Sequence, residues 1–313
     1  MAISADYFEY PHRKKGLDHS LFEMRYLKDA PKFNWGNGKS LALWLTVDVE
    51  FFPLDMGKSP FLPSGGLARP YPDVWNFTTR EYGNRVGNYR LMETINQAGA
   101  KATAFVQSAV VDEYPALMKD LVASGFEIAC GGADMGQIHS SQMNEQDEKA
   151  LILKALETLE KATGEKPAGW HSPSFSESLN TPELVAEAGV EYLCDWVNDD
   201  MPFPFTLGDK SLMSLPKQYD LSDRKLIFEQ QQTLSSFEYQ LRAAYKTLKA
   251  EATPEDGRIL SISLSPWVIG QPYRIQALEH FLAEVMADDA VVPMTGKEIA
   301  AVANRIFSGG KSC

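Results

Sequence analysis

A regular alternation of short apolar runs and longer amphipathic segments constrains the fold of this 313-residue chain more than any other feature. The runs at 41–50, 101–107 and 126–130 have the length of buried strands, and helix-like segments of 3.6-residue period separate them. The pattern continues to a strand-like run at 258–265. It predicts βαβ units on a parallel sheet. About seven strands favour a deformed (β/α) barrel, closed or nearly closed, over an open sheet.

The segments between the runs carry helix start signals. Asn144 precedes a long amphipathic segment and is its expected N-cap. Thr181 is the expected cap of the next helix, with Pro182 at the first helical position. A helix is also expected over 85–98. In (β/α) barrels the catalytic residues lie at the carboxyl ends of the strands, in the loops that lead to the helices. The strand ends of this chain are therefore where a site is expected.

Composition and loop character give the domain organisation. A hydrophobic content of 44% is enough for one core and no long linker interrupts the chain, so residues 40–313 are expected to form one barrel domain. Residues 1–39 are polar and aromatic, which predicts an N-terminal arm that wraps the barrel or a neighbouring subunit. The second arrangement would make the protein a homo-oligomer, either a dimer or a tetramer. The Pro- and Gly-rich loop at 51–75 is expected to cover the pocket.

Charge and missing motifs exclude several classes of function. The net charge of −12 and the lack of a basic stripe argue against nucleic acid and membrane partners. No apolar run reaches the roughly 18 residues of a membrane helix, and the first residues do not read as a secretory signal, which predicts a cytoplasmic protein. Cys130, Cys194 and Cys313 fit neither a zinc cluster nor a disulfide framework. Nucleotide-binding, serine-esterase and zincin motifs are absent, so no cofactor is expected.

Two acids stand at the end of the first apolar run, in the segment TVDVE. Asp48 and Glu50 are two residues apart, so in an extended strand their side chains point to the same side. Paired acids raise each other's pKa, and such groups suit general acid–base catalysis. The alternative is a solvated strand end without a catalytic role. The pair is the first candidate for catalytic residues.

The segment after the run 126–130 contains the next candidates. Gly131 and Gly132 would let the backbone approach a ligand, and His139 follows them closely enough to line the same pocket. Cys130 could act as a nucleophile beside His139, but a buried cysteine after a strand more often packs in the core. A single histidine is likewise more often structural than catalytic.

Later strand ends add a histidine, an acidic cluster and a tryptophan. His171 lies in the segment GWHSP, and Asp199 belongs to the acidic segment CDWVNDD. Trp267 follows a strand in the segment LSPW and would give a flat wall for a small ring or acyl group. Core packing explains a tryptophan at this position equally well. These three residues are candidates for substrate binding.

The order of these segments resembles that of the NodB-homology polysaccharide deacetylases. TVDVE, EIACGG, GWHSP, CDWVNDD and LSPW follow one another over about residues 41–300. The resemblance is strongest to the branch that includes the cofactor-free allantoinases, which share the NDD-M/L-P turn and a PWVIGQPYR-like segment. It implies the deformed barrel fold and hydrolysis of a carbon–nitrogen bond other than a peptide bond.

The resemblance also implies a degenerate metal site. In the metal-dependent members T-F-D-D supplies a base and a ligand, and here Asp48 matches the base while Val49 stands at the ligand. The motif H-G-x-x-H supplies two ligands, and here those positions are Gly131 and Met135, with Gly132 between them. These side chains cannot replace the ligands that zinc or cobalt takes. We therefore expect no metal.

Two further departures concern the acid and the third motif. Ser265 stands where the family has a histidine before Pro-Trp, which removes the usual general acid. His171-Ser172-Pro173 stands where the family has Arg-x-Pro. A histidine at this position offers a different proton donor.

The resulting prediction is a metal-independent hydrolase that acts on a small linear or cyclic amide, imide or ureide. Glu50, further out than Asp48, is the preferred base for activating water. Backbone N–H groups of Gly131 and Gly132 would stabilise the oxyanion, and His139 or His171 would protonate the leaving nitrogen.

Two alternatives remain open. The chain could be an inactive barrel that binds a sugar or another small metabolite. It could also deacetylate an N-acetyl sugar with a non-standard metal set such as Asp48, Glu50 and His139, which is reasonable ligand chemistry.

Overall fold

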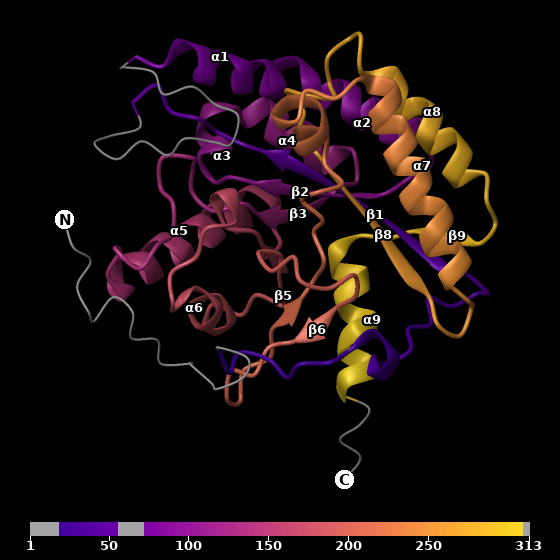
Figure 1. Ribbon diagram of the computed structural model, residues 1–313. Helices are drawn as coiled ribbons and strands as arrows, with labels where there is room; N and C mark the ends of the chain where they lie inside the picture. Colours follow the sequence, from indigo (N-terminus) through magenta and orange to yellow (C-terminus); the bar gives the residue numbers. More distant parts are fainter. Residues whose placement is uncertain (1–18, 56–71, 309–313) are drawn as a thin grey trace.

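The computed structural model describes residues 19–55 and 72–308, which form a curled sheet surrounded by helices (Figure 1). The strands are β1 (Leu41–Val49), β2 (Ala102–Val106), β3 (Glu127–Cys130), β4 (Gly169–Trp170), β5 (Tyr192–Leu193), β6 (Phe203–Pro204), β7 (Met213–Ser214), β8 (Arg258–Leu264) and β9 (Val291–Pro293). The α-helices are α1 (Val74–Tyr82), α2 (Asn88–Gln97), α3 (Ala109–Glu113), α4 (Pro115–Ala123), α5 (Glu145–Thr163), α6 (Thr181–Glu187), α7 (Leu234–Glu251), α8 (Ile275–Met286) and α9 (Gly296–Ser308).

The sheet has the order β6-β7-β5-β4-β3-β2-β1-β8, and β9 pairs with the start of β1. All pairs are parallel except β6 with β7. A parallel bridge between Ser222 and Ser263 connects the chain after β7 to β8 at the other side of the curl. The predicted deformed (β/α) barrel is therefore confirmed, with a closure that rests on short contacts rather than on a full strand pair.

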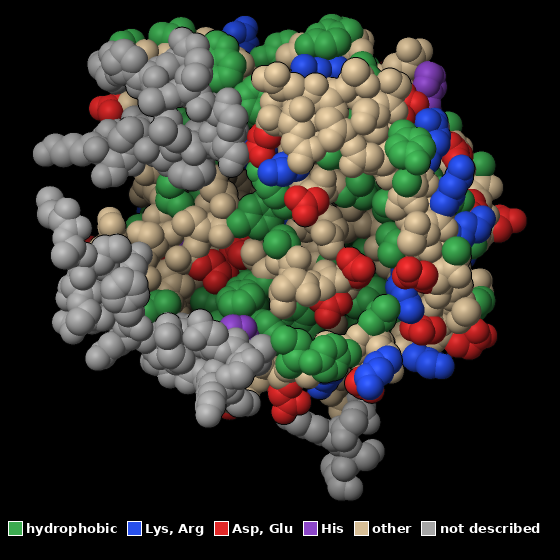
Figure 2. All heavy atoms as spheres, in the orientation of Figure 1, with side chains coloured by type: hydrophobic (Ala, Val, Ile, Leu, Met, Phe, Trp, Pro, Cys, Tyr) green, Lys and Arg blue, Asp and Glu red, His purple; other side chains and the backbone are tan. Residues whose placement is uncertain are grey.

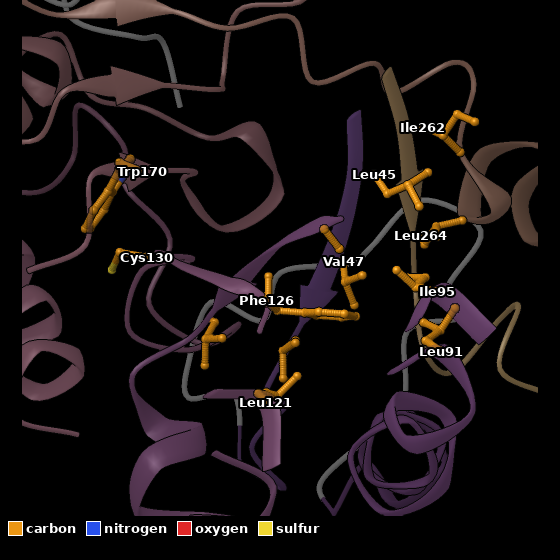
Figure 3. Packing of buried hydrophobic residues seen from close by; sticks show 14 of the residues in the cluster. Leu45, Val47, Leu91, Ile95, Leu121, Phe126, Cys130, Trp170, Ile262 and Leu264 are labelled. Atoms are coloured by element: carbon orange, nitrogen blue, oxygen red, sulfur yellow. The ribbon is translucent and has the colours of Figure 1, made fainter. Parts of the chain in front are cut away.

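Side chains of β1 alternate between two buried layers. The odd-numbered residues from Leu41 to Val49 pack in the cluster under the helices, whereas Ala42 and Trp44 belong to a second cluster inside the curl. Figure 3 shows side chains of β1 and β8 gathered with Leu91 and Ile95 of α2 in the first cluster. Because a strand has a two-residue period, Asp48 follows Trp44 toward the inside of the barrel.

The predicted helices form, with two corrections at their starts. Asn144 caps α5 as expected and accepts a hydrogen bond from the Asp147 N–H at 2.9 Å. The cap of α6 is Asn180 rather than Thr181, which is the first helical residue. The Thr181 hydroxyl instead bonds to Glu148 of α5 at 2.6 Å, so a tertiary contact replaces the local one.

The helix expected over 85–98 begins much earlier, because α1 continues into α2 through a wider π-helical turn, Gly83–Gly87. A Cβ atom on Gly87 would lie 2.0 Å from the Pro266 carbonyl oxygen, and one on Gly83 would lie 3.0 Å from the Trp267 nitrogen. The glycines therefore allow this helix to approach the loop after β8.

The described part of the expected arm packs on the barrel of its own chain. The Phe22 ring lies 4.6 Å from the ring of Phe203 and 5.6 Å from that of Trp196, and Phe33 is buried beside Trp35. The arm aromatics Tyr7, Phe8 and Tyr10, and most of the expected covering loop, lie outside the described residues. Within residues 19–55 and 72–308, none of the helices has the length and apolar character needed to span a bilayer.

Candidate active site

The first carboxylate of the site, Asp48, forms an ion pair with a buried lysine. The Lys217 ammonium nitrogen lies 3.1 Å from Asp48 Oδ2, and only 1% of the lysine side chain is exposed. Lys217 also lies over the rings of Phe105 and Phe175, at 5.8 and 4.9 Å from their centroids. Asp48 Oδ1 has no hydrogen-bond partner among the described residues. One oxygen is thus fixed by a cation and the other can still accept a proton.

The second carboxylate, Glu50, lies between two arginines. Arg224 Nη1 donates to Glu50 Oε1 at 3.1 Å, and Arg80 Nε lies 3.9 Å from Oε2. The Arg80 guanidinium is packed over the rings of Trp267 and Phe52, at 4.1 and 5.0 Å. Burial lowers the pKa of Arg80 to about 10 although Glu50 opposes the shift, so the group stays charged near neutral pH. Both oxygens of Glu50 therefore face cations.

A histidine–carboxylate pair completes the site. His171 Nδ1 lies 2.7 Å from Asp195 Oδ1, which also accepts the Ser172 N–H at 2.8 Å. Burial opposes ionisation of Asp195, but the hydrogen bonds from His171 and Ser172 hold its pKa below the usual range. Burial raises the pKa of Glu177 well above its usual range, and the nearby Asp195 charge adds to this shift. Asp195 is therefore the ionised partner that orients the His171 ring, which leaves Nε2 as the reactive nitrogen.

These groups meet in one pocket at the barrel mouth, the end of the sheet where β1, β2 and β3 finish. Its lining residues are Asp48, Glu50, Phe105, Gln107, Gly131, Met135, His171, Pro173 and Ser174. The cavity has a volume of about 20 Å³, which is room for about one water molecule. The pocket therefore brings together both predicted carboxylates, one predicted glycine and His171 around a space that a water or a carbonyl group can fill.

The structure contradicts the predicted oxyanion role for one of the two glycines, Gly131. The Gly131 N–H donates to the Val106 carbonyl at 2.9 Å as part of the sheet, so it cannot stabilise an oxyanion. Gly132 has φ +82° and packs against the Pro173 ring, where a Cβ atom would lie 2.6 Å away. A side chain at this position would therefore collide with Pro173. The Gln107 side-chain amide, which donates to Met135 Sδ at 3.1 Å, is a neutral donor on the pocket wall.

Three predicted site residues lie elsewhere. His139 is fully buried and bonds to Glu148 at 2.9 Å, with its ring against Trp170. Asp199 lines a different cavity of about 110 Å³ beside the arm. Trp267 packs on the Arg80 guanidinium and does not line the pocket. Cys130 is buried, and burial raises its pKa to about 12, which fits core packing rather than a nucleophile.

The sequence reasoning missed the charged partners of the site. Lys217 and Arg224 lie between β7 and α7, in a segment without periodicity and without a recognised motif. Arg80 lies on a helix that was expected to begin only at residue 85. Asp195 stands in the acidic segment that was noticed, but no local signal paired it with His171. A covariation between positions would be the signal that could have found these pairs.

The side chains at the barrel mouth do not fit a divalent metal. Val49 is buried in the core cluster, and Met135 Sδ accepts a hydrogen bond from Gln107. The Asp48 carboxylate is already paired with Lys217. Within the described ranges, three or more His, Cys, Asp or Glu side chains nowhere gather in a way that could hold a metal. Zinc and cobalt take imidazole, thiolate and carboxylate ligands, and both carboxylates of this pocket are already paired with cationic side chains.

The chain is similar in sequence to known polysaccharide deacetylases. A family model described as polysaccharide deacetylase matches residues 78–193. A Schizosaccharomyces pombe protein described as a polysaccharide deacetylase is 23% identical over 294 residues, covering 85% of this chain and 91% of that protein. A Helicobacter pylori peptidoglycan deacetylase is 26% identical over 129 residues, covering 41% of this chain and 43% of that enzyme.

Two solved structures share the fold over nearly the whole chain. A Pseudomonas aeruginosa PAO1 protein described as a polysaccharide deacetylase has a TM-score of 0.80 and 26% identity, and covers 90% of this chain and 98% of its own. The allantoinase PuuE has a TM-score of 0.77 and 26% identity, with the same two coverages. The similarity therefore extends well beyond the segment that the family model matches.

Proposed function

Since this chain belongs to the polysaccharide deacetylase family, we propose that it hydrolyses the carbon–nitrogen bond of a small amide, imide or ureide, without a metal ion. One observation carries the proposal. A single small pocket contains a carboxylate paired with a buried lysine and a histidine whose Nδ1 is paired with a buried carboxylate. A pair of titratable groups fixed in this way is typical of a general base and a general acid.

The ion pairs favour Asp48 over Glu50 as the base, which reverses the preference drawn from the sequence. Glu50 Oε2 and Asp48 Oδ1 both lack a hydrogen bond in the described part of the chain, but Glu50 is paired with two guanidinium groups and Asp48 with one ammonium group. Two cations therefore compete for the lone pairs of Glu50, and one for those of Asp48. A base needs a lone pair that can reach the water it activates. Glu50 then acts as the anion that holds Arg80 and Arg224 in place behind the pocket.

The reaction follows from these positions. Asp48 takes a proton from water, and the water oxygen forms a bond to the carbonyl carbon. The carbon–nitrogen bond breaks as His171 Nε2 gives a proton to the leaving nitrogen, and the ionised Asp195 stabilises the imidazolium that carries this proton. The proton on Asp48 then returns to His171 through solvent. Gln107 is placed to donate to the carbonyl oxygen, where negative charge develops.

The small cavity and the fold shared with an allantoinase support a small substrate over a polymer. The test is a panel of hydantoins, linear ureides, cyclic imides and N-acetylglucosamine oligomers, each assayed with and without EDTA. We expect release of product from a small amide, imide or ureide that EDTA does not reduce. Turnover of acetylated sugar oligomers that EDTA abolishes would instead favour a metal-dependent deacetylase, and no turnover at all would favour a binding barrel.

Two substitutions then identify the base. Asp48→Asn should lower kcat by about 10²–10⁴-fold, because the amide cannot accept the proton. Glu50→Gln is the matched control, and it should reduce kcat less because it changes only the packing of the arginines. A larger loss in Glu50→Gln than in Asp48→Asn would restore Glu50 as the base.

A further inference from the structure

Lys217 is a buried charge that takes no part in the proton transfers of the proposed reaction. Its side chain is among the largest fully buried side chains of the described residues, and its carboxylate partner is Asp48. We propose that Lys217 is a positioning residue that supplies, through Asp48, the fixed positive charge that a bound metal ion supplies in metal-dependent deacetylases. This inference rests on the proposed function, because Asp48 must be the base.

The segment that carries Lys217 is held rigidly. The Lys217 N–H donates to the Leu215 carbonyl at 2.9 Å, and the next amide, of Gln218, donates to Ser261 Oγ of β8 at 3.3 Å. The bridge between Ser222 and Ser263 fixes the same segment a few residues later. The backbone thus places the lysine between β7 and β8 before any substrate binds, which is the condition for electrostatic preorganisation.

Two aromatic rings link the lysine to the histidine of the site. Phe105 and Phe175 contact the Lys217 ammonium, and the same rings lie edge-on to the His171 ring at 5.5 and 4.4 Å. The faces of these rings stabilise the charged form of the lysine through cation–π interactions. They also separate Lys217 from the imidazolium that His171 becomes. The same two phenylalanine rings therefore contact both the lysine that holds the proposed base and the histidine that is the proposed acid.

A purely structural ion pair explains the arrangement less well. Burying a lysine and a carboxylate removes both from water, and a hydrophobic pair of similar size would often be as stable. The pair lies at the pocket, and its carboxylate retains an oxygen without a partner in the described residues. A second cation of charge +2 bound to Asp48 would be repelled by the ammonium 3.1 Å away. The lysine therefore takes the place of the ion.

The kinetic test compares Lys217→Met with Lys249→Met. Lys249 forms the same kinds of contact, with Asp288 and with the Tyr245 ring, but on the outside of the barrel. On the substrate found in the panel, Lys217→Met should lower kcat about 10²-fold while KM changes less than about threefold. Lys249→Met should retain the wild-type kcat. A kcat of Lys217→Met within about threefold of wild type would overturn the inference.

A second arm does not depend on activity. Thermal unfolding of Asp48→Asn, Lys217→Met and the double variant should show that each single change lowers Tm and that the double change lowers it by less than the sum. Additive losses would mean that the pair does not form in solution, which overturns the inference. If Lys217→Met does not fold, Lys217→Gln replaces it under the same criteria.

Zinc alone is the third probe. Wild-type protein titrated with zinc should show no saturable binding that Asp48→Asn abolishes, and such binding would overturn the inference. If the wild-type protein turns over nothing in the panel, the proposed function fails on its own. The unfolding and zinc arms then still decide whether Lys217 and Asp48 form the pair that replaces a metal.

Discussion

Two histidine–carboxylate pairs in this molecule have almost the same geometry and opposite surroundings. His139 and Glu148 lie 2.9 Å apart, and His171 and Asp195 lie 2.7 Å apart. Both side chains of the first pair are fully buried. In the second pair the histidine retains 9% of its side-chain surface and lines the pocket at the barrel mouth.

The hydrogen bonds around the carboxylates explain the difference. Glu148 also accepts bonds from the Ser178 and Thr181 hydroxyls, so the pair connects α5 to the start of α6. Asp195 holds His171 beside Asp48, across a space of about one water molecule. The same pairing therefore connects two helices in one place and, in the proposed reaction, presents a ring nitrogen to the substrate in the other. The two histidines therefore differ in whether their rings line the pocket and not in having a carboxylate partner.

Replacing each histidine by glutamine should give the largest difference between the two pairs. His171→Gln should lower kcat about 10²–10⁴-fold with a small change in Tm, because it removes the general acid. His139→Gln should lower Tm, because it disturbs a buried network, while its folded fraction retains activity within about threefold. Measured kcat and Tm for both variants check this. Loss of activity in a folded His139→Gln protein would return His139 to the catalytic group.

Substitutions of the two carboxylates, Asp195 and Glu148, should show the same contrast between activity and stability, with a smaller effect on kcat. Asp195→Asn should lower kcat about 10²-fold, since the imidazole remains but loses the anion that stabilises its charged form. Glu148→Gln is the matched control and should change mainly the stability. The contrast fails if Asp195→Asn leaves kcat unchanged, because His171 would then need no charged partner.

The smallest expected effect is on the acid stability of the protein. Burial opposes ionisation of Glu148, but bonds from His139, Ser178 and Thr181 lower its pKa. A carboxylate with a lowered folded pKa stabilises fully above its unfolded pKa, about 4.3, and this contribution is lost as the pH falls through the folded value. Urea unfolding from pH 6 to pH 3 should therefore lose stability less steeply in Glu148→Gln than in wild type. An identical slope would show that Glu148 is not held ionised in solution.

The surface charge on the face in view is mixed in sign. On the face shown in Figure 2, Lys and Arg side chains are interspersed with Asp and Glu, and no continuous basic area forms there. The charges that matter for the proposed reaction are buried at Lys217 and Arg80 and partly buried at Arg224.

Much of the fold was predictable because its signals are local. The strand length at 41–50 and the cap at Asn144 depend on neighbouring residues, and both agree with the structure. The two-residue period of β1 also placed Asp48 and Glu50 on one side, where both line the pocket. Where a tertiary contact competed with a local one, as at Thr181, the local expectation was wrong by one residue.

The sequence by itself determined the parallel barrel, and it pointed to the strand ends, where the pocket with Asp48, Glu50 and His171 lies. Only the tertiary structure decided which histidine reaches the pocket and which cations hold the carboxylates. Lys217 and Asp48 are 169 positions apart, and Arg224 and Glu50 are 174 apart. No local period or motif relates such residues. Their pairing is fixed only when the sheet curls and brings the segment after β7 against β1 and β8.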